Sequence, residues 1–234
     1  MKYIFEGCNQ LLSLYISNFD FGSLNHLIDI LNELTNLEYL NIDNIDISKI
    51  SDISYMFYNL QSLTSLDLST LNTSSITKMS YLFKDCKQLT LLNLTNIDTS
   101  NIEDMEGMFY NCQNITELDL SYFNTSYVNN LGKMFYNCSV LTSLNISHFK
   151  THLVNNMENM FEGCISMETL DISNFDLNSL THHPIKIFSP LINLETFILF
   201  NINISNVKDL SYFFFKSSIF NFFRYIKFRY IFSY

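Results

Sequence analysis

The stretch LTSLDLSTLNTSSITKMSYLFKDC, residues 63–86, is the unit from which most of the chain is built. It returns with small changes as LTLLNLTNIDTSNIEDMEGMFYNC at residues 89–112, ITELDLSYFNTSYVNNLGKMFYNC at 115–138 and LTSLNISHFKTHLVNNMENMFEGC at 141–164. The four copies begin 26 residues apart, and each ends in cysteine. A short fixed period of this kind predicts a stack of similar turns instead of one compact core.

An apolar or aromatic residue three positions before the cysteine keeps the same period beyond these copies. After a one-residue insertion near His182-His183-Pro184, it continues towards the C-terminus. A period of about 20 to 29 residues with an LxxLxLxxF pattern is typical of a leucine-rich-repeat solenoid. We therefore predict one array of about nine turns over residues 1–217. The periodic positions are Phe5, Leu31, Phe57, Phe83, Phe109, Phe135, Phe161, Phe188 and Phe214.

Each repeat combines two hydrophobic periods. Alternation predicts a short parallel strand in which Leu66 and Leu68 point inward and Asp67 outward. The segment 76–83 has apolar residues at helical spacing, so we expect a short helix there. Serines at the preceding corner suit helix N-caps, namely Ser74, Ser100 and Ser126. The predicted fold is α/β, with a parallel sheet on the concave face and short helices on the convex face.

The ends are less regular. Proline is not tolerated in the middle of a helix, so we expect a loop or distorted turn at His182-His183-Pro184. Residues 218–234 are aromatic and basic; a cap, a basic amphipathic helix at a membrane surface and a tail read in a non-native frame all remain open. The first ten residues match the end of a repeat and have no secretory signal, which suggests a fragment of a longer chain.

The charge restricts the partners. The formal net charge is −10, and the residues before Lys216 carry 9 basic against 23 acidic residues, a net −14. An acidic body argues against nucleic acid, because phosphate contacts need clustered Lys and Arg. It is compatible with cationic partners and with simple solubility. The chain has no apolar run of about eighteen residues before the tail, so no integral membrane span is expected.

The periodic cysteines Cys86, Cys112, Cys138 and Cys164 are the sharpest chemical signal. Stacked turns place their sulfurs about 5 Å apart, which allows disulfides as well as simple burial. Zinc ligands usually come in close CxxC pairs, which are missing here. We favour a buried structural ladder, with disulfide or metal roles as the alternatives.

Two columns of outward side chains run across the predicted strands. One alternates Asp with Asn through six turns; since neighbouring carboxylates about 4.8 Å apart repel, alternation doubles their spacing to about 10 Å. An exposed parallel sheet is where a solenoid presents a binding surface, and a partner docking there should present Lys or Arg. The alternative is a solvated face without a ligand. The candidate binding face consists of Tyr39, Asn41, Ser65, Asp67, Asn93, Glu117, Asp119, Asn145, Thr169 and Asp171.

Catalysis has little support in the sequence. Glu117 and Asp119 face the same way, but an open sheet does not desolvate them. The five histidines have neither nucleophile nor metal spacing, and there is no phosphate loop or GxSxG motif. We therefore expect no enzymatic activity and no cofactor.

The repeat LxxLDLSxFxTSxVxxMxxMFxxC resembles those of BspA-like leucine-rich-repeat surface proteins. The likeness is carried by residues 118–121, Phe123, residues 125–126, Val128, residues 134–135 and Cys138. It implies a cell-surface or secreted protein that binds host or matrix proteins in adhesion, without enzymatic activity. Our leading hypothesis is a non-enzymatic protein-binding module, monomeric or part of a longer chain, which contacts a protein or matrix macromolecule. The alternative is a structural spacer or stalk.

Overall fold

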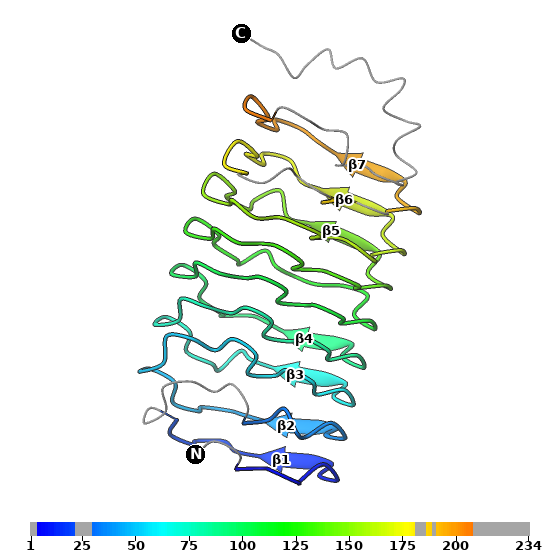
Figure 1. The fold of residues 1–234 in the computed structure, drawn as a ribbon. Coiled ribbons are helices and arrows are strands. Elements are labelled where there is room, and N and C mark those ends of the chain that lie inside the picture. The colour runs from blue at the N-terminus through cyan, green and yellow to red at the C-terminus, as the bar shows by residue number, and fades with distance from the viewer. Residues whose placement is uncertain (1–3, 22–29, 181–185, 189–190, 208–234) are drawn as a thin grey trace.

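The structure, a computed structural model, describes residues 4–21, 30–180, 186–188 and 191–207. Its turns stack one above the other along a single axis, and the short strands lie along one side of the stack (Figure 1). Each strand has three residues, and its middle residue points into the stack. The strands are β1 (Ser13–Tyr15), β2 (Tyr39–Asn41), β3 (Ser65–Asp67), β4 (Leu91–Asn93), β5 (Ser143–Asn145), β6 (Thr169–Asp171) and β7 (Thr196–Ile198).

The predicted strand register is confirmed. Leu66 and Leu68 are buried, whereas Asp67 between them is exposed. Pairing is parallel and joins equivalent residues of successive turns, as Leu66 pairs with Leu92. The strands form three separate sheets, β1-β2, β3-β4 and β5-β6-β7. The array is therefore a parallel β-solenoid built on the 26-residue repeat.

The prediction of an α/β fold with convex helices and nine turns is wrong. The described residues contain no helix and form about seven turns of β-solenoid. The side opposite the strands is instead a back wall, which we define as residues 52–60, 78–86, 104–112, 130–138 and 156–164. Parallel bridges connect these segments from turn to turn, through Asp52, Lys78, Asp104, Asn130 and Asn156.

The back wall is a succession of tight turns. Within one segment, the N–H groups of Leu82, Lys84 and Cys86 bond to carbonyls three residues back. The alternate N–H groups, such as those of Tyr81 and Phe83, bond to the next turn of the solenoid. An α-helix needs its N–H groups bonded four residues back within the same segment. The back wall cannot be helical, because half of its donors hold the neighbouring turn.

Left-handed residues enforce this conformation. Each complete back-wall segment has two residues with positive φ, such as Tyr81 (55°) and Asp85 (62°). The second lies directly before the last residue of the segment, which is Leu60 in the first segment and cysteine in the other four. It is always Asn, Asp or Gly, the residues that enter the left-handed region at the lowest cost. These residues are Asn59, Asp85, Asn111, Asn137 and Gly163.

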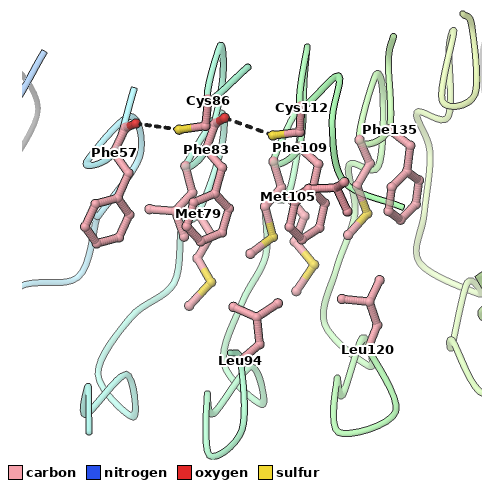
Figure 2. Packing of buried hydrophobic residues seen from close by; sticks show 14 of the residues in the cluster. Phe57, Met79, Phe83, Cys86, Leu94, Met105, Phe109, Cys112, Leu120 and Phe135 are labelled. Atoms are coloured by element: carbon pink, nitrogen blue, oxygen red, sulfur yellow. Dashed lines mark hydrogen bonds between the residues drawn. The ribbon is translucent and has the colours of Figure 1, made fainter. Parts of the chain in front are cut away.

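The predicted periodic aromatic residues form the centre of the core (Figure 2). Phe57, Phe83, Phe109 and Phe135 are fully buried and stack with ring centroids 5.6, 5.6 and 5.7 Å apart. The stack continues through Phe161. Such contacts occur only between neighbouring turns, so each added turn covers the apolar face of the one before. Phe214 lies outside the described residues.

Buried polar groups are also arranged as ladders. Thr73 is 1% exposed; its hydroxyl donates to the carbonyl of Asp98 in the next turn and accepts the N–H of the same residue. Thr99 and Thr125 repeat this arrangement. A buried hydroxyl that both donates and accepts a hydrogen bond adds little to the free-energy cost of burial. These bonds also fix the register between neighbouring turns.

Two further expectations fall outside this description. The loop expected at His182-His183-Pro184 and the tail at 218–234 lie outside the described residues. Within the described ranges, no helix has the length and apolar character needed to cross a bilayer.

Candidate functional site

All ten residues of the candidate binding face lie on the outer side of the strand face, which we define as the outer side chains of β1–β7 and of residues 117–119. Seven are exposed, and Asn41, Thr169 and Asp171 are half-buried. The strand pairing brings several of them side by side, as in Asp67 with Asn93 and Asn145 with Asp171. The structure therefore places the candidate residues on one side of the stack, although the strand pairing along that side is interrupted.

The Asp and Asn column has a structural role that the sequence analysis missed. At the end of β3, Asp67 Oδ1 accepts the backbone N–H of Ser69 at 2.8 Å. The equivalent oxygens of Asn93 and Asp119 accept the N–H two residues further on, both at 3.0 Å. Asp and Asn each carry an Oδ1 acceptor, so either residue can form the Asx turn that ends the strand. Charge spacing alone does not explain the column.

The same contacts keep the carboxylates charged. Hydrogen bonds from Ser69 hold the pKa of Asp67 below its usual value, and those from Ser121 do the same for the pKa of Asp119. A hydrogen bond to the charged form favours ionisation. The strand face is therefore an anionic surface at neutral pH.

The strand face is interrupted where the corner residue after the strand changes. Four pairs of neighbouring strands are hydrogen-bonded: β1-β2, β3-β4, β5-β6 and β6-β7. In each pair, the turn of the second strand has an asparagine with positive φ at this corner, namely Asn44, Asn96, Asn174 or Asn201. Three other turns have Thr70, Tyr122 or His148 there; none of these residues adopts positive φ, and none of these turns forms a strand ladder with the turn before it. The turn of β1 has Asn18 at this corner, also with positive φ. Asparagine enters the left-handed region more readily than threonine or tyrosine. The corner residue thus marks where the sheet opens.

One of these interruptions contains a shallow depression of about 390 Å³. It lies across β2, β3 and β4, and its lining includes Tyr39, Asp43, Asp67, Leu91 and Asn93. Two carboxylates are present, and none of the lining residues is basic. Its lining includes five residues of the candidate binding face, namely Tyr39, Asn41, Ser65, Asp67 and Asn93.

Exposed apolar side chains gather in the same region. Tyr39 is 44% exposed and contacts Tyr15 of the preceding turn, with ring centroids 5.2 Å apart. Leu91 is 69% exposed. Large outward side chains of this kind, next to ionised carboxylates, offer a partner apolar and electrostatic contacts together.

The repeat also determines the relationship to known proteins. Residues 1–117 and 77–190 each match the model of the family described as "Mycoplasma protein of unknown function, DUF285". The chain belongs to this family. No curated protein matches the DUF285 chain.

The back wall of this DUF285 member carries a second polar network. Tyr81 stacks on Tyr55 and donates its hydroxyl to Glu106, which also accepts from Asn130 and Lys133. Burial raises the pKa of Glu106, but these hydrogen bonds more than offset it, so the pKa lies below its usual value. Burial and the bond to Glu106 together raise the pKa of Tyr81. These polar groups are engaged with one another across the turns.

The same wall packs tightly around its aromatic side chains. The Tyr81 ring lies over Gly107, where an added Cβ would come within 2.2 Å of the ring. Lys84 lies over the rings of Tyr58 and Tyr110 at 4.6 and 5.6 Å from their centroids. The tyrosines that recur near the periodic Phe residues were visible in the sequence. Because a helix was predicted for this segment, the stacking of these tyrosines between turns was not expected.

The periodic cysteines are structural in the DUF285 fold. Cys86, Cys112, Cys138 and Cys164 are free and fully buried. Each thiol donates to the carbonyl of a periodic Phe, such as Cys86 to Phe57 at 3.0 Å (Figure 2). Burial raises the pKa of the Cys86 thiol to about 12. The described residues also hold no group of His, Cys, Asp or Glu suited to a metal ion.

Proposed function

We propose that this chain is a non-enzymatic binding module whose strand face contacts a protein or matrix macromolecule. The observation that supports this best is the contrast between the two sides. On the back wall, Tyr81 and Lys133 both bond to Glu106, whereas the strand face presents Tyr39, Asp67 and Leu91 to solvent. Solenoids commonly bind their partners through such an open face.

The chemistry of the strand face favours recognition over catalysis. A general acid or base at neutral pH needs a pKa near 7. The pKa values of Asp67 and Asp119 are lowered instead. Permanently ionised carboxylates suit a partner that presents Lys or Arg, because complementary charge accelerates association.

The location is also part of the proposal. The likeness of the repeat to BspA-like surface proteins supports a cell-surface or secreted setting, in which the partner is a host or matrix macromolecule. The solenoid then acts in adhesion.

The test compares two matched triple variants. Glu117→Gln/Asp119→Asn/Asp171→Asn neutralises three acids of the strand face while keeping the Oδ1 acceptors of the Asx turns. Glu103→Gln/Asp104→Asn/Glu158→Gln neutralises three acids around the back wall and changes the net charge equally. Binding to a panel of immobilised, purified matrix proteins is measured by surface plasmon resonance. We expect only the strand-face variant to weaken binding, mainly through slower association. Loss confined to the back-wall variant contradicts the proposal.

A structural spacer is the second candidate function. The Phe, Cys and Thr ladders run through successive turns without using the strand face. Such ladders make an extended and stiff array, which is what a stalk needs. Absence of binding to every member of the matrix panel favours this spacer.

A further inference from the structure

The depression across β2, β3 and β4 combines three kinds of group on one open face. Asp43 and Asp67 supply charge, Tyr39 supplies an exposed aromatic ring, and Leu91 supplies an exposed aliphatic side chain. The carboxylates come from successive turns, one on each side of the unpaired β2–β3 junction.

Each carboxylate is held in place but not saturated. Asp43 Oδ2 accepts the amide of Asn41 at 2.8 Å. Asp67 accepts the backbone N–H of Ser69 and further hydrogen bonds from the side chains of Ser69 and Asn93. A carboxylate has about four lone-pair sites, so each retains acceptor capacity, and both residues line the depression. The described structure places no basic side chain in the lining to use that capacity.

We propose that this depression seats an arginine side chain of a partner polypeptide, which rests on the binding function proposed above. A guanidinium has five donors in a planar fork, so one group can reach two separate carboxylates and stack on a tyrosine ring at the same time. An ammonium is a compact point charge without this fork. The methylene groups of the arginine stem, or an apolar neighbour in the partner, pack against Leu91.

The probe is N-acetyl-arginine amide, titrated into the isotopically labelled full chain and followed by NMR. The lysine analogue tests the guanidinium, and the citrulline analogue removes the charge while keeping the shape. We expect saturable shifts at residues 39–43, 65–69 and 91–95 with the arginine compound. The lysine compound should bind more weakly, and the citrulline compound should give no saturable shifts.

Three variants make the test specific. Asp67→Asn keeps the acceptor for Ser69 and should weaken arginine binding about fivefold by removing one charge. Tyr39→Leu removes the ring but keeps apolar bulk, with a loss of about the same size. Asp98→Asn is the matched control, because Asp98 makes the same kind of Asx turn, with Ser100, outside both the depression and the strand face. It should leave the arginine affinity unchanged.

Equal binding of the citrulline or lysine analogue overturns the proposal, as does an equal loss in Asp98→Asn. So does the absence of saturable shifts in the depression. These outcomes are separable from the matrix-panel test. The chain could bind the matrix panel through Glu117, Asp119 and Asp171 and yet not respond to the arginine compound. That result supports the proposed binding function and contradicts only the proposed arginine site.

Discussion

Asp67 Oδ1 accepts the backbone N–H of Ser69 at 2.8 Å, at the point where β3 ends. Comparable bonds recur at the other two corners of the solenoid, as the turn that contains β4 shows. Its three acceptors are Asn93, Asp98 and Asp104, each bonded to the N–H two residues further on. One Asn or Asp side chain therefore forms each of the three corners of this solenoid turn. The Asx turn is the corner motif that repeats along the fold.

The first prediction separates this acceptor from the charge. Asp119→Asn retains Oδ1, so the free energy of unfolding should be unchanged within about 0.5 kcal/mol. Asp119→Ala removes the acceptor of the Ser121 N–H and should cost about 1 kcal/mol. Urea denaturation measures both values. Equal stability of the two variants means that the Asx bond does not contribute.

The second prediction concerns pH. Hydrogen bonds from serine lower the pKa of Asp67, Asp98 and Asp119 in the folded state. The stabilisation is therefore present above the unfolded pKa of about 4 and is lost as pH falls through the lowered folded values. The triple variant Asp67→Asn/Asp98→Asn/Asp119→Asn cannot lose this contribution. Between pH 7 and pH 3, the unfolding free energy of this variant should fall less than that of the wild type. An equal fall in both proteins contradicts a contribution from these three carboxylates.

The third prediction uses the cysteines. Cys8 is exposed, whereas the other four of the five are buried. At pH 8, a thiol reagent should label one cysteine rapidly in the native protein and all five in denaturant, as counted by mass spectrometry. Burial also raises the pKa of the Cys164 thiol to about 12, so little reactive thiolate is present. Rapid labelling of Cys112 or Cys138 in the native state contradicts the buried ladder.

The fourth prediction concerns the opening of the sheet. Thr70→Asn introduces the corner residue that accompanies strand pairing in the other turns. We expect β2 and β3 to pair. Amide exchange at Ile42 and Ser65 should slow about fivefold, the equivalent of about 1 kcal/mol per hydrogen bond.

The control for this change is Thr116→Asn, which alters an exposed threonine away from the corner. It should leave the exchange rates at Ile42 and Ser65 unchanged. Closure of the junction by Thr70→Asn should also weaken binding of the arginine probe. Unchanged exchange in Thr70→Asn refutes the role of the corner residue.

The sequence predicted the features that depend on the 26-residue period. The inward positions of Leu66 and Leu68, the phenylalanine stack and the buried cysteines all follow from which side chains return at equal intervals. Apolar residues that recur in every turn must meet their equivalents in the next turn. The outward placement of the candidate binding face followed from the same register.

The helices were predicted wrongly because spacing alone does not distinguish a helix from consecutive tight turns. Ile76, Met79, Leu82 and Phe83 recur at intervals of three and four, and all are buried. The distinguishing signal was the Asn, Asp or Gly before each cysteine, exemplified by Asp85 with φ of 62°. The interruptions of the strand face depend on corner residues such as Thr70, whose effect appears only when neighbouring turns are compared.

In the described part of the chain the solenoid has no helix, because the back wall uses its backbone donors to hold the turns together. The most direct test is NMR of residues 76–86 in the full chain, using ¹³C secondary shifts and the scalar couplings that report φ. We expect left-handed φ at Tyr81 and Asp85, with the donors of Tyr81 and Phe83 bonded to the next turn. An uninterrupted run of helical shifts and couplings from residue 76 to residue 83 contradicts the account.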